Sequence, residues 1–197
     1  SEDGFSYQRD TELDMRAGKE QGLTAKDVLN TYSEKEIARI LFEYGEMRYS
    51  RQIAKEITIR RAEKKFNTTF DLVRLLEEKV PPRFLNSDLS RLFQAIRIEV
   101  NGELENLEKV LIEGADLLEE GGRMVAVSYH SLEDRIVKNS LRANEKLRVL
   151  TKKPLEPTEE ETAVNVRARS AKLRAAEKDS AGKTASKNKY QKSNLQK

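Results

Sequence analysis

The feature that most constrains the fold is a short apolar run at residues 124–127, which ends in the polar cluster Ser128-Tyr129-His130-Ser131. Two glycines precede the run, and a charged segment with helical spacing follows it. A short apolar run bounded by turn signals is typical of a buried strand. The pattern predicts a strand at 124–129 and a helix directly after it, with Ser131 as the N-cap.

The sequence around this strand predicts an α/β arrangement. Apolar residues recur in steps of three and four from Leu89 to Leu118, which indicates one long helix or two that meet at Asn101-Gly102. Residues 147–154 and 167–178 are further strand candidates, and PTEEET at 157–162 is interpreted as a linker. Helix, strand, helix and two more strands are typical of one part of an α/β sandwich.

Residues 24–80 predict a separate all-helical unit. The capping-box patterns TAKD (24–27) and SEKE (33–36) mark helix starts, as does a Thr in NTTF (67–70). Pro81-Pro82 ends the last of these helices, and Asn86-Ser87-Asp88 offers a cap for the next one. The residues expected to form a small core share helical spacing: Ile37, Leu41, Ile53, Ile57, Leu72 and Leu76. We expect a hinge within 81–88.

The net charge of +3 comes from the C-terminal tail. Residues 179–197 carry five Lys and one Asp among Ser, Asn and Gln, whereas the first 178 residues sum to −1. Such a segment has little to bury, so a disordered basic tail is predicted, which either holds a polyanion weakly or only aids solubility. No apolar run reaches the length of a membrane span, and no membrane association is expected.

The composition also limits the chemistry. With no Cys and one His, the chain has no disulfide framework and no thiolate metal site, and we expect no metal. None of its nine Gly belongs to a GxGxxG or GxxxxGK[ST] pattern. The sequence therefore indicates no cofactor-binding residue, and these patterns do not identify the catalytic residues.

The polar cluster after the strand is a candidate ligand site, because α/β sheets bind ligands at the carboxyl ends of their strands. His130 and Ser131 lie there. His130 is interpreted either as the wall of a pocket or as a turn residue, and proton transfer is a third possible role. Adjacent residues point in different directions, so a nucleophile–base pair between them is not expected.

Two further segments suit RNA. Phe5 and Tyr7 lie beside Arg9 in a loop, where rings either stack on a base or pin the loop to the core; the sequence favours the core. Arg167 and Arg169 share one face at strand spacing and meet either phosphate or water.

Five segments in order resemble a known family: DGFSYQRDTELDMR, FQAIRIEVNGELENLE, LLEEGGRMVAVSYHSLEDRIVK, LTKKPLEPTEEE and RARSAKLRAAE. They are similar to the bacterial 16S ribosomal RNA cytosine-N4 methyltransferases of family H, the MraW type. The resemblance implies the C-terminal half of a class I Rossmann-like methyltransferase with an inserted all-helical domain. It also implies S-adenosylmethionine as cofactor, small-subunit ribosomal RNA or the 30S subunit as partner, and a cytoplasmic setting.

The family begins earlier than this sequence, with the loops that hold most of the cofactor. The resemblance therefore implies a truncated methyltransferase that binds no S-adenosylmethionine and is inactive alone. The alternative is a non-catalytic RNA-binding or ribosome-assembly module. The expected parts are a loop at 1–23, the inserted helical domain at 24–84, the methyltransferase part at 85–178 and the tail at 179–197. We expect the strand at 124–129 to expose an unpaired edge and an apolar face. This half should then either pair with another copy of itself, as a homo-oligomer, or be partly disordered.

Overall fold

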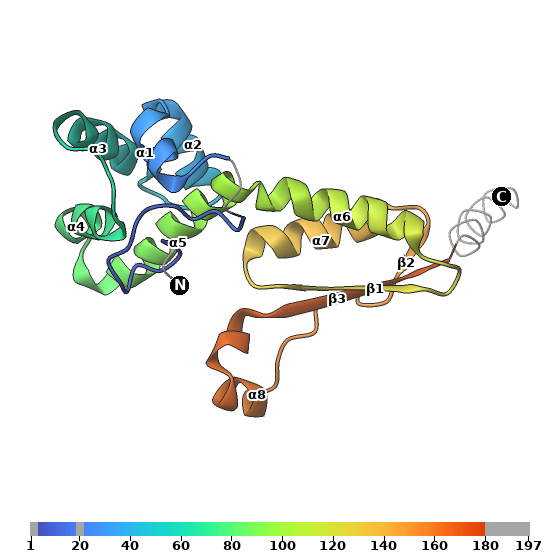
Figure 1. Cartoon of the computed structure of the whole chain (residues 1–197). Coiled ribbons are helices and arrows are strands. Elements are labelled where there is room, and N and C mark those ends of the chain that lie inside the picture. Colours follow the sequence, from blue (N-terminus) through green and yellow to red (C-terminus); the bar gives the residue numbers. More distant parts are fainter. Residues whose placement is uncertain (1–3, 19–21, 180–197) are drawn as a thin grey trace, which may run out of the picture. The chain divides into compact units, whose positions relative to one another are not determined.

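The computed structural model describes residues 4–18 and 22–179, and the chain divides into two compact units, Ser1–Glu103 and Leu104–Lys197. The described residues form eight α-helices, one 3-10 helix and one three-stranded sheet (Figure 1). The first unit is helical, and the second combines helices with the sheet. The α/β class is thereby confirmed.

Five helices build the first unit: α1 (Ala25–Thr31), α2 (Glu34–Glu43), α3 (Ser50–Glu63), α4 (Thr69–Lys79) and α5 (Pro82–Asn101). The predicted caps are confirmed, because Thr24 and Ser33 each accept a hydrogen bond from the backbone three residues on. The acids at those positions bond back to the cap, and Thr68 holds the N-cap position of α4. Local hydrogen bonds thus fix three helix starts.

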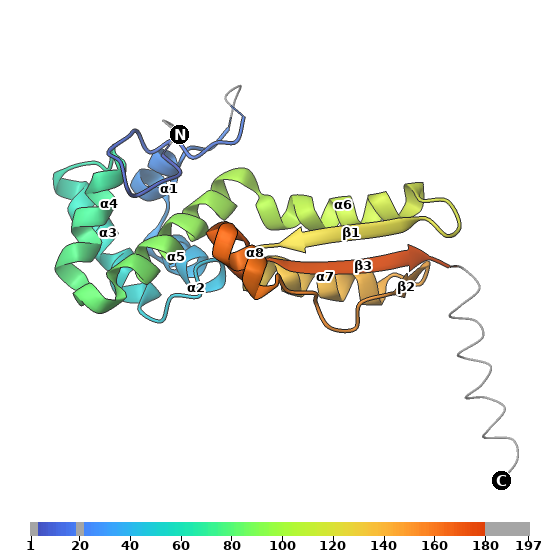
Figure 2. The same cartoon turned by 90° about the horizontal axis from the view of Figure 1, so that it is seen from below.

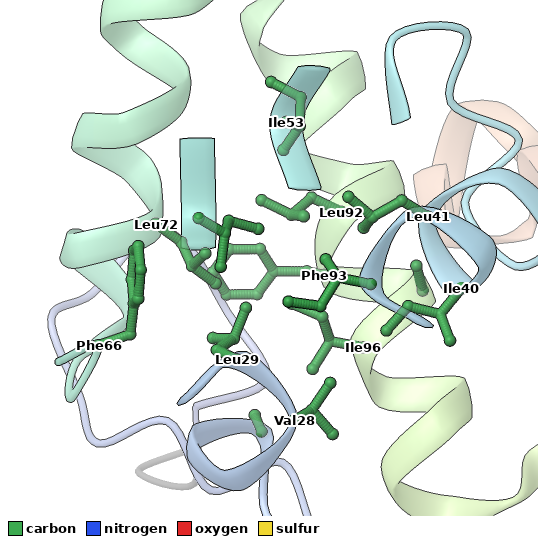
Figure 3. Packing of buried hydrophobic residues seen from close by; sticks show 14 of the residues in the cluster. Val28, Leu29, Ile40, Leu41, Ile53, Phe66, Leu72, Leu92, Phe93 and Ile96 are labelled. Atoms are coloured by element: carbon green, nitrogen blue, oxygen red, sulfur yellow. The ribbon is translucent and has the colours of Figure 1, made fainter. Parts of the chain in front are cut away.

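The core of the first unit contains all six predicted residues, each of which is buried. Helix α5 adds Leu92, Phe93 and Ile96 to the same core (Figure 3). The compact unit that contains this core extends to Glu103. The predicted cap at Asn86-Ser87-Asp88 is wrong, since α5 begins at Pro82 and continues through 81–88 without a hinge. Proline suits the first helical position, where no N–H is needed.

The N-terminal loop belongs to this helical unit. Leu13 and Met15 are fully buried in its core. The Leu13 N–H donates to the Asn67 carbonyl oxygen over 3.0 Å, and the Asn101 side-chain amide donates to the Met15 carbonyl oxygen over 2.8 Å. The middle of the loop is therefore held by the connection between α3 and α4 and by the last residue of α5.

Gly102 divides the long apolar stripe into two helices. It adopts the left-handed conformation (φ 56°, ψ 37°), which favours glycine, and α6 (Glu103–Leu117) begins directly after it. Residues of the stripe before Gly102 pack in the helical core, whereas Leu107, Leu111 and Ala115 pack in the core of the second unit. The sequence predicted either one long helix or two that meet at Asn101-Gly102, and the structure has two helices.

The second unit continues with β1 (Arg123–Ser128), α7 (Ser131–Ala143), β2 (Leu147–Val149), α8 (Glu159–Val164), the 3-10 helix η1 (Val166–Ser170) and β3 (Lys172–Lys178). The sheet order is β1-β3-β2, and both pairs are antiparallel. The predicted linker at 157–162 is wrong, because Thr158 caps α8 by accepting from the Glu161 N–H over 3.2 Å. The second predicted strand is shorter than 147–154.

One face of this sheet is covered and the other is open. Met124 and Ala126 face a core to which α6 and α7 contribute, and these helices lie along one face of the sheet in Figure 1. Figure 2 looks onto the opposite face, where Val125 is 57% and Val127 is 50% exposed. Strand β1 pairs only with β3 among the described residues. The predicted unpaired edge and apolar face are thus confirmed.

Two further predictions concern membrane association and the C-terminal tail. Within the described residues, no helix combines the length and the apolar content that crossing a bilayer requires. Residues 180–197 of the predicted tail lie outside the described residues. Asp179 still belongs to the sheet end, because its N–H donates to the Lys146 carbonyl oxygen over 2.9 Å.

Candidate functional site at the carboxyl end of strand β1

The candidate site begins where β1 ends. Ser128 is buried, and its hydroxyl donates to the Lys172 carbonyl oxygen over 3.3 Å. The next residue, Tyr129, is 55% exposed. Alternation along the strand places Tyr129 on the same side as Val125 and Val127. The strand therefore delivers an aromatic ring to the solvent at its carboxyl end.

His130, not Ser131, is the N-cap of α7. Its Nδ1 accepts from the Glu133 N–H over 3.4 Å, and Ser131 is the first residue of the helix. In return, Glu133 Oε2 accepts from the N–H groups of Tyr129 (2.8 Å) and His130 (3.3 Å). This is a capping box with an imidazole in place of the usual hydroxyl. The predicted cap at Ser131 is wrong by one residue.

The capping role fixes the state of the His130 ring. A nitrogen that accepts a hydrogen bond carries no proton, so the ring proton of the neutral form lies on Nε2. Nε2 is 3.3 Å from Glu133 Oε1, yet it is buried and makes no well-aligned hydrogen bond within the described residues. His130 thus caps α7, and its Nε2 has no hydrogen-bond partner among the described residues.

Glu133 places a negative charge beside this turn. Burial raises the pKa of Glu133, but the His130 side chain and the Tyr129 N–H lower it by more, so the pKa lies below its ordinary value. The carboxyl group is therefore ionised at neutral pH. The sequence contained the signal, an acid three residues after the cap, but His is not among the usual caps.

A buried ion pair holds the start of α7 against the sheet. The Arg174 side chain is only 7% exposed, and its Nε and its terminal nitrogen donate to the two Asp134 oxygens over 2.7 and 3.1 Å. The hydrogen bond from Arg174 lowers the pKa of Asp134. This paired geometry holds the first turn of α7 directly after His130, and neither residue was among the predicted site residues. The sequence feature that could have indicated this ion pair is an arginine at an inward-facing position of β3.

Arg167 and Arg169 lie at the same end of the sheet. They are exposed in η1, which leads into β3, and the first residue of β3, Lys172, pairs with Ser128. The prediction that they share one strand face is wrong, because residues two apart in a 3-10 helix point about 120° apart. The topology nevertheless brings them to the sheet end that carries Tyr129 and His130.

The remaining candidates belong to the helical unit. Phe5 and Tyr7 are partly buried against its core, and the Tyr7 ring meets Phe93 edge to face at 5.5 Å. Arg9 is exposed, and its carbonyl oxygen accepts from the Thr69 hydroxyl over 2.6 Å. The interpretation that the aromatic rings pin the loop to the core is confirmed.

The Gly-Gly turn before β1 does not form the cradle that a nucleoside cofactor requires. A phosphate- or carboxylate-binding loop presents free backbone N–H groups, for which adjacent glycines are suited. The Gly-Gly pair before β1 uses both of its N–H groups, from Gly121 to the Lys178 carbonyl oxygen and from Gly122 to the Glu119 carbonyl oxygen. This turn thus closes the sheet end, and no step through a cofactor is derived for it.

One end of the α/β sheet thus gathers an exposed aromatic ring, a carboxylate and two exposed arginines, which are groups that can contact a polar ligand. Comparison with known proteins specifies the class. Residues 1–179 match the MraW methylase family. The chain belongs to this family, which confirms the resemblance in the sequence.

Relatives of the chain are named ribosomal RNA small subunit methyltransferase H. The protein from Thermotoga neapolitana is 52% identical over 180 residues, which cover 88% of this chain and 59% of the relative. The protein from Carboxydothermus hydrogenoformans is 48% identical, with 89% and 63% covered, and that from Synechocystis sp. is 48% identical, with 89% and 57% covered. The chain therefore spans about 60% of the length of these curated relatives.

Proposed function

We propose that the chain forms the target-base side of an S-adenosylmethionine-dependent methyltransferase that acts on small-subunit ribosomal RNA in the cytoplasm. The acceptor would be the exocyclic N4 amine of a cytidine. The observation that carries this proposal is the family match over residues 1–179, together with relatives about half identical that are named as ribosomal RNA methyltransferases. In this reading, 24–84 is a domain inserted into a Rossmann-like fold, of which the α/β unit is the C-terminal part.

The geometry at the end of β1 suits the nucleoside side of such a reaction. The cytosine amine is a weak nucleophile, since its lone pair is conjugated with the ring, so catalysis depends on positioning and on acceptors for its N–H groups. Tyr129 offers an exposed ring for stacking, and His130 and Ser131, which follow it at the start of α7, would form the adjoining wall. Glu133 is a positioning residue, because it holds the backbone of both Tyr129 and His130.

The arginines of η1 would contact the RNA backbone. Arg167 and Arg169 are exposed and lie at the same sheet end as Tyr129. Guanidinium groups bind phosphate oxygens through paired hydrogen bonds. Phe5, Tyr7 and Arg9 are proposed to support the RNA side through the loop they stabilise, with Arg9 the one exposed group among them.

The test adds to the chain the part of a relative's sequence that the chain does not cover. The chain is joined to that part of the Thermotoga neapolitana protein, and unmethylated 30S subunits are incubated with S-adenosylmethionine. Mass spectrometry of the nucleosides should show N4-methylcytidine with the joined protein and none with the chain alone. The Glu133→Gln form should be slower, whereas Glu108→Gln, on the exposed surface of α6, should not differ.

Two other results would change the conclusion. Methylation of a different base would contradict the N4 assignment. If the joined protein bound 30S subunits but transferred no methyl group, the alternative would hold, namely a non-catalytic RNA-binding or assembly module.

A further inference from the structure

The helical unit carries two adjacent hollows on its surface, where α2 ends and α3 begins. The first has a volume of about 540 Å³ and the second about 390 Å³, within the range of roughly 300–1,000 Å³ that is usual for ligand sites. Tyr49 and Gln52 line both hollows, so they form one continuous surface. We call this the α2–α3 surface; no role in the proposed reaction has been assigned to it.

The first hollow carries positive charge that the protein does not neutralise. Its lining includes four basic residues and no acidic one: Lys35, Arg39, Arg48 and Arg51. Arg39 is paired with Glu43 over 3.0 Å and with Glu99 over 3.2 Å. The other three are exposed, and within the described part of the chain they have no carboxylate partner. Three unpaired cations around one hollow favour an anionic ligand.

Exposed aromatic rings lie among these cations. Phe42 is 65% and Tyr49 is 61% exposed, whereas most other large apolar side chains of this unit are buried in its core. Phe84 lines the second hollow and is also exposed, and the Arg83 guanidinium lies over its ring at 4.6 Å. Large exposed rings that alternate with cations are the arrangement by which proteins bind single-stranded nucleic acid, since bases stack on the rings and phosphates meet the cations.

We propose that the α2–α3 surface binds a single-stranded segment of RNA. Bases would stack on Phe42 and Tyr49, and phosphates would contact Lys35, Arg48 and Arg51. The choice of RNA rests on the proposed function, because ribosomal RNA is the substrate named for the relatives. An acidic peptide would use the charges but would leave the rings exposed, so RNA accounts for more of the surface.

The test measures binding of the full chain to a fluorescently labelled, single-stranded 12-nucleotide RNA by anisotropy, at several salt concentrations. The double variant Arg48→Gln/Arg51→Gln should bind more weakly. It should also reduce the slope of log K against log salt by about 1.4, since each lost phosphate contact on a single strand contributes about 0.7. Phe42→Ala should weaken binding by roughly tenfold with the slope unchanged, because stacking releases no counterions.

Matched controls separate this surface from general charge and from the basic tail. Lys64→Gln/Lys65→Gln removes two charges at the other end of α3, and Ile59→Ala removes an exposed apolar side chain outside both hollows. Both should bind RNA like the unaltered chain. All substituted side chains are exposed, and circular dichroism checks that each variant folds.

The proposal is wrong if the surface variants bind RNA as well as the controls do, or if the chain does not bind the RNA. It is also wrong if polyglutamate displaces the RNA as effectively as unlabelled RNA does. The binding assay contains no methyl donor, so its outcome is independent of the methylation assay. A chain that binds RNA here but supports no methylation would contradict the proposed function alone.

Discussion

The two units of this protein bury their apolar residues in different ways. In the helical unit, five helices and the N-terminal loop enclose one core, and twelve of its large side chains are almost fully buried: Leu13, Met15, Leu29, Ile37, Ile40, Leu41, Ile57, Leu72, Leu75, Leu76, Leu92 and Ile96. In the α/β unit, helices cover one face of the sheet, while Val125 and Val127 remain open on the other.

The difference follows from how each kind of element satisfies its backbone. A helix bonds its own N–H and C=O groups, so a helical unit is complete once its apolar stripes meet. A strand needs a neighbour for its backbone groups and cover for both faces when both are apolar. In β1 the residues on both faces are apolar, and one edge has no partner among the described residues. Of the two units, the α/β unit is therefore the one that has an apolar face and a strand edge open to another protein segment.

The largest predicted effect is a cavity in the helical core. Phe93 is buried and meets Tyr7 edge to face, so Phe93→Ala should destabilise the helical unit by about 3–5 kcal/mol. Phe42→Ala, the same change at an exposed position, should cost less than about 0.5 kcal/mol. Hydrogen exchange read by mass spectrometry should show faster exchange in α1 to α5 for Phe93→Ala. Equal loss of protection in the α/β unit would contradict two separate cores.

The second prediction concerns the ion pair between α7 and β3. Arg174→Met leaves the partly buried Asp134 carboxylate without its partner and should destabilise the α/β unit by about 2 kcal/mol. The double variant Arg174→Met/Asp134→Leu removes both charges and should regain most of this loss. Urea unfolding followed by circular dichroism measures both. If the double variant were as unstable as the single one, packing rather than charge would explain the effect.

The same pair gives a pH dependence with a definite sign. Hydrogen bonding from Arg174 lowers the pKa of Asp134 in the folded state. The pair therefore stabilises the protein above the ordinary carboxyl pKa of about 3.9, and this contribution is lost as the pH falls through the lower folded value. The stability difference between the unaltered chain and Asp134→Asn should be constant near neutral pH and should shrink in acid.

Much of the helical unit could be predicted because its signals are local. Thr24 and Ser33 lie within three residues of the groups they bond, so the sequence alone identifies them. The extent of the unit could not be predicted in this way. Phe93 and Leu111 continue one stripe, and only the left-handed conformation of Gly102 assigns them to different cores. Membership of a core is a tertiary property that helical spacing does not encode.

The candidate site was predicted in position but not in detail. The strand end at His130 was correct, yet the cap was assigned to Ser131, because hydroxyl side chains are the usual caps. Arg167 and Arg169 have the spacing of one strand face, but they lie in a 3-10 helix, where this spacing does not place them on one face. Asp134 and Arg174 are forty residues apart, so no local pattern links them.

The third prediction tests the turn at His130. Glu133→Gln keeps the shape of the side chain but removes the charge that accepts from Tyr129 and His130, and it should destabilise α7 by about 1 kcal/mol. Because the folded pKa of Glu133 is lowered, the difference from the unaltered chain should be full near neutral pH and should shrink as the pH falls through the lowered folded value. Thermal melting over a series of pH values from neutral into the acid range measures this. A difference that did not shrink in acid would show that charge is not the cause.

The smallest effect on stability, and the most informative for the comparison, is expected on the open face. Val125→Lys/Val127→Lys should change the free energy of unfolding by less than about 0.5 kcal/mol per site, because both side chains are already at least half exposed.

We predict that the unaltered chain self-associates at high concentration through this apolar face and the β1 edge. The lysines should weaken that association, since like charges would meet across a symmetric contact. Sedimentation velocity over a hundredfold concentration range measures it, with Lys64→Gln/Lys65→Gln as a surface control on the other unit. A chain that stays monomeric over this range would contradict the prediction. It would show that an open apolar face and an unpaired strand edge are not sufficient for self-association.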